Sequence, residues 1–272
     1  MIEFFSAVIE YRFMQYALLA CLLASLGCGV IGTYVVVKRI SFLTGGIAHT
    51  VLAGMGIAYY FKGSPVIGAV IAALITAILI GWIKLRWRQD EDVLIAAFWS
   101  VGMAIGILFI SKTPGYNTDL MSYLFGNILL VTVNDLILMA VLDVVVFATV
   151  FICYKQFLAA TFDEEFARLR GINVEAYYIL LLCMIALTIV LLIQIVGLIL
   201  VMALLVLPAA SAVQFSNSIP RMMMIAAMLS VLITTSGLML SYQPDLPSGA
   251  TIIVVAGIVY FISIIYRRII RV

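Results

Sequence analysis

The sequence predicts an all-α protein, a polytopic bundle of about eight or nine helices that cross a membrane. Of its 272 residues, 66% are hydrophobic and only 10% are charged. Soluble domains carry about 25% charged residues, so this chain has too few charges to cover a surface that faces water. The apolar residues also fall into long runs, and about 20 such residues form a helix that spans the bilayer. We therefore expect most of the surface to face lipid.

Nine apolar runs are long enough to be candidate spans. They are residues 14–37, 45–61, 65–83, 93–110, 135–154, 176–193, 195–215, 222–241 and 249–266. The stretch 176–214 is too long for one helix, and Gln194 and Gly197 mark a turn within it. If one of the runs enters the membrane only part-way, the number of spans is eight. The sequence contains no long internal repeat and no soluble segment, which predicts a single membrane domain over residues 1–272.

Basic residues predict which ends of the spans face the cytoplasm, because cytoplasmic loops keep more Lys and Arg than the opposite side. With the N-terminus outside, only Arg12, Lys62 and Lys112 fall outside, which leaves twelve of the fifteen basic residues inside. This arrangement places the C-terminus, with Arg267 and Arg268, in the cytoplasm. The net charge of +2 gives no basis for binding nucleic acid.

Few ionisable residues lie inside the predicted spans, where such residues are costly and usually functional. His49 is the single histidine and lies in the run 45–61. It either binds a ligand or lines a pathway, or it packs and hydrogen-bonds inside the bundle. Asp143 lies in the middle of the run 135–154. It either pairs with a neighbouring helix or lines a pathway.

The longest predicted cytoplasmic connection contains a further helix, near residues 161–173. Thr161 suits the start of this helix, because its hydroxyl can accept a hydrogen bond from a free backbone N–H. Three acidic residues follow in the first turn, where the helix dipole favours negative charge. Gly171 suits the end, where the backbone commonly turns left-handed.

This cytoplasmic helix has one apolar face, formed by aromatic and aliphatic side chains at helical spacing. The helix either lies on the lipid headgroups or docks into a groove on a cytoplasmic partner. The residues that would meet a partner are Phe162, Glu165, Phe166, Leu169, Arg170 and Gly171.

The sequence lacks the motifs of common ATP-binding and hydrolytic sites. It has no GxxxxGK[ST] phosphate loop, no HExxH pair and no GxSxG elbow. We therefore expect a transporter subunit rather than an enzyme, with any ATP hydrolysis carried out by a separate chain. The alternative is a stand-alone secondary transporter. Such a protein would usually show repeat symmetry and paired broken helices, and this sequence contains neither.

Five segments carry a resemblance that covers almost the whole chain. They are ALLACLLASLGCGVIGTYVVVKRISFLTGGIAHTVLAGMG (17–56), YLFGNILLVTVND (123–135), FDEEFARLRGINV (162–174), VGLILVMALLVLPAASAVQFSNS (196–218) and DLPSGATIIVV (245–255). In their order and content they resemble the membrane-spanning permease subunits of bacterial ATP-binding-cassette (ABC) importers for zinc, manganese and chelated iron.

The resemblance implies a permease that forms a homodimer in the bacterial cytoplasmic (inner) membrane. Two ATP-binding-cassette ATPase subunits would dock on its cytoplasmic side, at the segment near 161–173. An extracytoplasmic metal-binding protein would dock on the other side. The chain would bind no cofactor of its own, and a divalent metal ion would be the cargo that passes along the dimer axis.

The resemblance also implies roles for particular residues. His49 matches the family's histidine and is expected to face the central pathway near the dimer axis. Asp143 and Asp245 are further candidates for assisting the metal ion, with helix packing and helix capping as their alternative roles. Many family members carry an acid four residues before this histidine, where this chain has Gly45. Because divalent cations prefer several N or O ligands, this difference leaves the choice among zinc, manganese and iron open.

Overall fold

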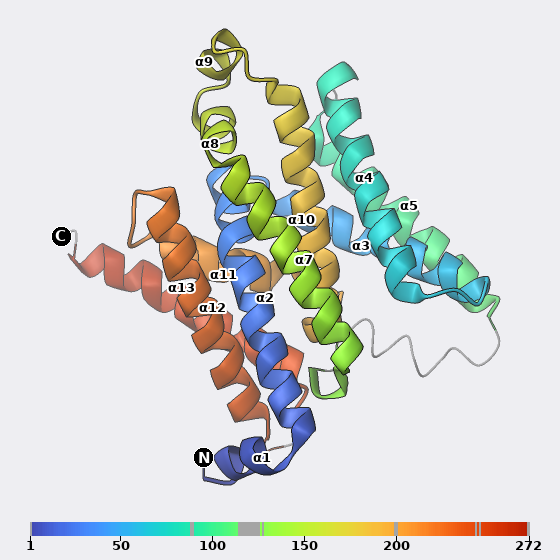
Figure 1. Ribbon diagram of the computed structural model, residues 1–272, viewed down its shortest axis with the longest axis vertical. Coiled ribbons are helices and arrows are strands. Elements are labelled where there is room, and N and C mark those ends of the chain that lie inside the picture. The colour runs from blue at the N-terminus through green and yellow to red at the C-terminus, as the bar shows by residue number, and fades with distance from the viewer. Residues whose placement is uncertain are drawn as a thin grey trace. The chain divides into compact units, whose positions relative to one another are not determined.

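The computed structural model describes residues 2–87, 90–113, 126, 128–198, 201–242, 244 and 246–270. Within these ranges all of the regular secondary structure is helical, as predicted (Figure 1). The helices are α1 (Ile2–Glu10), α2 (Arg12–Val37), α3 (Ser41–Tyr60), α4 (Pro65–Trp87), α5 (Glu91–Ser111), the short η1 (Ile128–Leu130), α7 (Val133–Ile152), α8 (Tyr154–Phe162), α9 (Glu164–Leu169), α10 (Val174–Val196), α11 (Val201–Val213), α12 (Ile219–Tyr242) and α13 (Ser248–Ile270).

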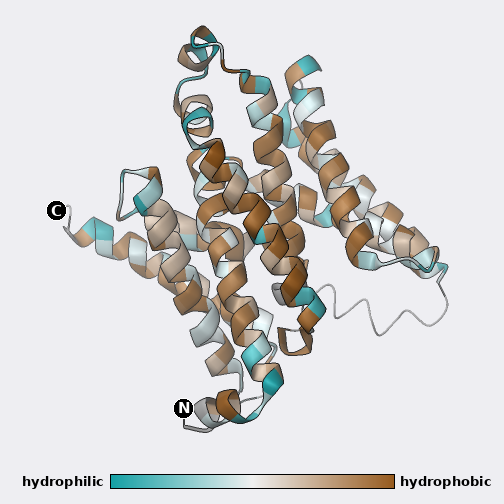
Figure 2. Cartoon of the chain, viewed as in Figure 1, coloured by the Kyte–Doolittle hydropathy of each residue, from teal (hydrophilic) through white to brown (hydrophobic). Residues whose placement is uncertain are grey.

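Eight of the described helices are long and apolar enough to cross a membrane, namely α2, α3, α4, α5, α7, α10, α12 and α13. Figure 2 shows the hydrophobic residues that run along them. The remaining predicted run, 195–215, contains α11, which has only 13 residues. A helix of that length rises about 20 Å, roughly two thirds of the hydrocarbon core of a bilayer. The lower predicted count is therefore confirmed for the described residues, and the turn expected at Gly197 is present with a φ of +76°.

The chain divides into two compact units, which we describe separately. The first contains Met1–Val36, Asp119–Val144 and Leu191–Val272, and the second contains Val37–Thr118 and Val145–Val190. Helices α7 and α10 each run from one unit into the other. The first unit therefore holds nearly all of α2 together with α11, α12 and α13. The second unit holds α3, α4, α5, α8 and α9.

Small residues let the helices of the first unit approach closely. A β-carbon placed on Gly29 of α2 would lie 2.5 Å from the Cβ of Ala227 in α12. One placed on Gly32 would overlap the backbone oxygen of Leu205 in α11. Only glycine fits at these two crossings, where the close approach supplies the van der Waals contact that holds helices together in lipid.

Glycines also set the distances between helices in the second unit. A β-carbon on Gly46 of α3 would lie 2.6 Å from Ile95 Cγ2 of α5. On the other side of α3, a β-carbon on Gly54 would overlap the backbone oxygen of Gly68 in α4. Helix α3 therefore packs directly on both α4 and α5, and this arrangement positions the side chains that α3 carries.

Candidate functional site

His49 lies in α3, and its ring stacks on the indole of Trp99 in α5. The two ring centroids are 4.2 Å apart and the planes are inclined by 15°. The half-buried imidazole keeps its Nδ1 buried and without a hydrogen-bond partner among the described residues. The stack therefore fixes the orientation of the ring without using this nitrogen. The ring therefore packs against another helix, and a role for His49 in the metal pathway stays a prediction.

The close contact between α3 and α5 explains this stack. Beside His49, a β-carbon on Gly102 of α5 would lie 2.5 Å from Thr50 Cγ2. Together with Gly46, this glycine lets the two backbones approach far enough for the flat rings to meet face to face. One helical turn before His49, Gly45 is buried and supplies no ligand atom from its side chain.

The described residues include no group of three or more His, Cys, Asp or Glu side chains that could hold a metal ion. His49 thus offers one nitrogen ligand rather than a complete coordination shell. Further ligands would have to come from water, from a second chain or from residues outside the described ranges.

Asp143 belongs to the first unit, whereas His49 belongs to the second. Its side chain in α7 is only 4% exposed, and neither carboxylate oxygen has a hydrogen-bond partner within the described ranges. The thiol of Cys28 in α2 lies near this carboxyl. A buried carboxylate without partners is costly, which is consistent with a functional position. Asp245 lies outside the described residues, so its role stays a prediction.

The segment expected to be one cytoplasmic helix is two short helices, α8 and α9. Thr161 lies in the last turn of α8, so the expectation that it starts the helix is wrong. Asp163 separates the two helices with extended backbone, and its carboxylate accepts a hydrogen bond of 2.9 Å from the backbone N–H of Phe166. A carboxylate at this position satisfies a free N–H and also interacts favourably with the helix dipole.

The end of α9 agrees with the prediction that Gly171 stops the helix. Gly171 has a φ of +76°, in the left-handed region that favours glycine. Its N–H donates to the carbonyl oxygen of Arg168, and the N–H of Ile172 donates to that of Ala167, both at 3.0 Å. This pair of hydrogen bonds is the Schellman motif, which ends many helices.

All six residues predicted to meet a partner are exposed. Leu169 is 88% exposed and Phe166 is 47% exposed, and the guanidinium of Arg170 lies 5.0 Å from the Phe166 ring centroid. By contrast, Ala167 is buried against Ala160 and Val174. Helix α9 therefore places its small apolar residue inward and leaves its large ones outside, the reverse of an ordinary surface helix.

Lys38 connects the α8–α9 segment to the start of α3. Its Nζ donates a hydrogen bond of 2.9 Å to the carbonyl oxygen of Ala160 and lies 3.6 Å from a carboxylate oxygen of Glu164. Burial lowers the pKa of Lys38, and Glu164 partly offsets this effect. The side chain therefore holds the turn between α2 and α3 against the beginning of α9.

A second ionic cluster joins the C-terminal end of α4 to the N-terminal ends of α5 and α10. Lys84 of α4 forms an ion pair with Glu91 of α5. It also donates a hydrogen bond of 3.0 Å to the hydroxyl of Tyr178 in α10, which in turn donates one of 2.9 Å to Glu91. Lys38 and Lys84 both lie over the Tyr178 ring. These contacts bind α4, α5 and α10 to one another beside the α8–α9 segment.

The sequence profile of the ABC 3 transport family matches residues 10–267, nearly the whole chain. The chain belongs to the ABC 3 transport family. With its eight apolar helices it is a multi-pass membrane protein and the membrane-spanning part of its transport system. The resemblance found from the sequence is thereby confirmed.

Named relatives of this ABC 3 family chain come from several bacteria. The "Probable metal transport system membrane protein" of Chlamydia trachomatis is 42% identical over 258 residues, which cover 93% of this chain and 88% of the relative. The "Manganese transport system membrane protein MntC" of Halalkalibacterium halodurans is 35% identical and covers 97% of this chain and 90% of its own. A solved structure, "PsaBC from Streptococcus pneumoniae in complex with Fab", matches with a TM-score of 0.88 and 30% identity, over 97% of this chain and 95% of that one.

Sequence reasoning missed two features of this ABC 3 family chain. No motif or periodic pattern connects Trp99 with His49, because the two residues lie 50 positions apart in the sequence. The basic turn that contains Lys38 was used only to predict orientation. Neither of its partners, Ala160 and Glu164, could be identified before the helices were packed.

Proposed function

We propose that this chain is the permease subunit of an importer for divalent transition-metal ions, driven by a separate ATPase. Membership of the ABC 3 transport family over residues 10–267 carries this proposal. Relatives whose names specify metal and manganese transport support the choice of cargo. In this proposal the chain works as a homodimer in the cytoplasmic membrane and receives the ion from an extracytoplasmic metal-binding protein.

The exposed apolar face of α8 and α9 supports a docking role for this segment. Phe162, Phe166 and Leu169 leave large apolar side chains in contact with solvent, which is costly unless another surface covers them. In our proposal the covering surface is a groove on the ATPase. Closure of the ATPases would then push on α8 and α9 from the cytoplasmic side.

Lys38 would pass this movement to the pathway. It holds the α8–α9 segment through Ala160 and Glu164, and it lies three residues before α3 begins at Ser41. A shift of the docking segment would therefore move the start of the helix that carries His49. The Lys84–Glu91–Tyr178 cluster would keep α4, α5 and α10 together during this movement.

His49 would act as a transient metal ligand in the pathway. A neutral imidazole binds manganese, iron and zinc ions through a nitrogen lone pair, and the Trp99 stack holds the ring in place for this contact. A single ligand from each chain would hold the ion weakly and let it leave. Asp143 and Asp245 are proposed to assist the ion elsewhere along its route.

Metal accumulation in cells tests the proposed function directly. We expect deletion of the chain to abolish high-affinity uptake of one of manganese, zinc or iron, and we expect the wild-type chain to restore it. The ions are measured one at a time at submicromolar concentration with radioactive tracers. Unchanged uptake of all three ions would contradict the proposal. Uptake into proteoliposomes that needs an ion gradient but neither ATP nor an ATPase would favour a secondary transporter.

Replacing Lys38 by methionine should uncouple ATP hydrolysis from transport. Methionine keeps the apolar stem but loses the bonds to Ala160 and Glu164. The loss of one charged hydrogen bond of about 1.5 kcal/mol corresponds to roughly a tenfold lower uptake rate. We expect the ATPase to co-purify normally. Arg39→Gln is the matched control, because it removes an exposed neighbouring cation. Equal losses in both variants would count against a specific role for Lys38.

A further inference from the structure

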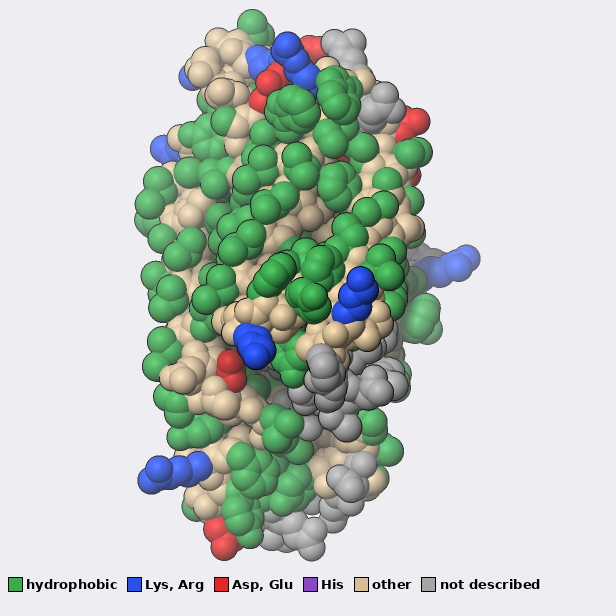
Figure 3. All heavy atoms as spheres, turned by 90° about the vertical axis from the view of Figure 1, so that its right-hand side faces the viewer, with side chains coloured by type: hydrophobic (Ala, Val, Ile, Leu, Met, Phe, Trp, Pro, Cys, Tyr) green, Lys and Arg blue, Asp and Glu red, His purple; other side chains and the backbone are tan. Residues whose placement is uncertain are grey.

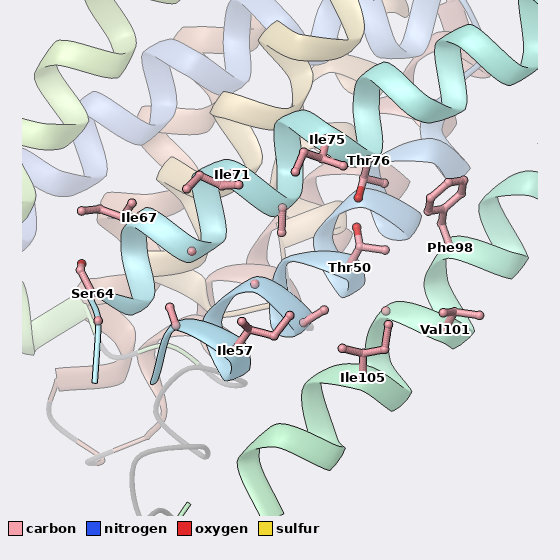
Figure 4. A pocket seen from close by; sticks show the side chains of 17 residues that line it. Thr50, Ile57, Ser64, Ile67, Ile71, Ile75, Thr76, Phe98, Val101 and Ile105 are labelled. Atoms are coloured by element: carbon pink, nitrogen blue, oxygen red, sulfur yellow. The ribbon is translucent and has the colours of Figure 1, made fainter. Parts of the chain in front are cut away.

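Helices α3, α4 and α5 of the second unit enclose an apolar groove of about 670 Å³ (Figure 4). Thr50 and Gly54 of α3 contribute to its floor. Ile67, Ile71 and Ile75 project from α4 along one wall, and residues of α5 form the other. Few side chains fill the space at the floor, because Gly54 and Gly68 have none and bring the backbones of α3 and α4 into contact.

The groove opens sideways from helices that are long and apolar enough to span the membrane. Its wall residues remain substantially exposed, as Ile71 shows with 53% of its surface accessible. Figure 3 shows the same side of the chain, where hydrophobic side chains cover most of the surface over α4 and α5. Because its lining is almost entirely apolar, the groove suits an apolar occupant such as a lipid chain.

The length of the groove matches one leaflet of a bilayer. It extends along α4 from Ser64 to Thr76, and these twelve helical steps correspond to roughly 18 Å. One leaflet supplies about half of the 30 Å hydrocarbon core. The groove therefore accommodates an acyl chain that reaches from the membrane surface to the middle of the bilayer.

A second pocket of about 580 Å³ continues the groove at its Ser64 end, and both are lined by Gly63. The pocket contains Lys62 from the α3–α4 turn and Lys112 from the end of α5, together with the side chains of Tyr60 and Thr113. Neither lysine forms an ion pair with any acidic residue that the structure describes. Two cations without an acidic partner among the described residues thus lie at one end of an apolar groove.

Lys62 also occupies an uncommon backbone conformation. Its φ is +58°, and its N–H and that of Gly63 donate to the carbonyl oxygens of Tyr59 and Ala58. This is the Schellman position, where glycine avoids the steric cost that a side chain carries. A lysine there carries a backbone cost that glycine would avoid.

We propose that this groove binds one anionic phospholipid, with an acyl chain along α4 and its phosphate between Lys62 and Lys112. The apolar walls and length fit the chain, and the two unpaired lysines fit the negative headgroup. The site belongs to the lipid-facing side of α3, α4 and α5. Its lining includes neither His49 nor any residue of α8 and α9.

Native mass spectrometry of the full-length chain in detergent tests the headgroup contact. Phosphatidylglycerol should bind more tightly than phosphatidylethanolamine. The double variant Lys62→Gly/Lys112→Gln should lose about fivefold in phosphatidylglycerol affinity for each lysine, the factor for one cation at an anionic surface. Glycine is the residue that the left-handed backbone at position 62 favours. The substitution should therefore not destabilise the fold, and misfolding would not account for the loss of lipid binding. Arg12→Gln, which removes another cation predicted outside, should bind normally.

The apolar contact is tested by filling the groove. Ile71→Trp should lower phosphatidylglycerol binding at least fivefold, because the indole occupies the space of the acyl chain. Ile78→Trp is the control, since Ile78 is 46% exposed on the same helix but does not line the groove. Inorganic phosphate at the same concentration should not displace the lipid.

Three results would overturn this proposal. The first is equal binding of both lipids by the wild-type chain. The second is displacement of phosphatidylglycerol by free phosphate, which would make the lysines a simple anion site. The third concerns Ile71→Trp. If this variant still binds the lipid normally but no longer forms the cross-linked dimer that the wild-type chain forms, the occupant of the groove is a second copy of the chain.

Discussion

Replacing His49 by phenylalanine is expected to abolish metal uptake while leaving protein levels unchanged. Phenylalanine keeps a flat ring that can stack on Trp99, but it has no nitrogen to offer an ion. The loss of residues that merely support a metal ligand costs about 10–100-fold in metal affinity or activity, and loss of the ligand itself should cost at least as much. Initial uptake rates of the tracer metal, normalised to membrane protein abundance, measure the effect.

A comparison with His49→Ala separates the two roles that the sequence left open. Alanine removes both the nitrogen and the stack, so a packing role predicts low protein levels for alanine and normal uptake for phenylalanine. A ligand role predicts lost uptake for both variants wherever the protein is present. Normal uptake by His49→Phe would therefore remove the imidazole from the mechanism.

Replacing Phe166 by aspartate should break the complex with the ATPase and abolish transport. Phe166 lies at the centre of the exposed face of α8 and α9, and a buried aromatic residue at the centre of an interface contributes about 2 kcal/mol or more, roughly 30-fold in affinity. The carboxylate would also lie beside Glu165. Because the side chain is outside the packed core, the variant should insert and accumulate normally. Co-purification with the ATPase measures the effect.

Two matched variants control for this experiment. Phe166→Leu keeps an apolar side chain and should retain most of the binding. Phe215→Asp introduces the same charge at a phenylalanine that is also 47% exposed, in the predicted cytoplasmic turn before α12, and should leave co-purification intact. Normal assembly and uptake by Phe166→Asp would contradict docking at this segment and leave a surface helix at the headgroups as its better description.

Most of the fold could be predicted from hydropathy. Each spanning helix in the described part of the chain corresponds to one predicted run, because lipid requires about 20 apolar residues for every crossing. Hydropathy was less informative for α11. The predicted run is long enough to span, but α10 ends at Val196, Gly197 follows with a positive φ, and α11 is only 13 residues long.

The α8–α9 segment shows where local sequence rules succeed and fail. The stop at Gly171 and the exposed apolar face follow from residue type and spacing. The start was misplaced because Thr161 and Asp163 are both good N-caps, and the choice between them depends on how far α8 extends. That extent is set by the packing of Ala160 and Ala167 against Val174, which spacing within the segment does not reveal.

The sequence by itself determined the membrane class, the order of the spans and their number to within one, the family and the single candidate imidazole, because each of these depends on composition or on residues close together in the chain. Only the tertiary structure decided that His49 stacks on Trp99, that Lys38 holds the α8–α9 segment, and that two lysines lie at the end of an apolar groove. These contacts join residues far apart in the chain. They depend on how closely the helices approach, and glycines such as Gly46, Gly54 and Gly102 set that distance.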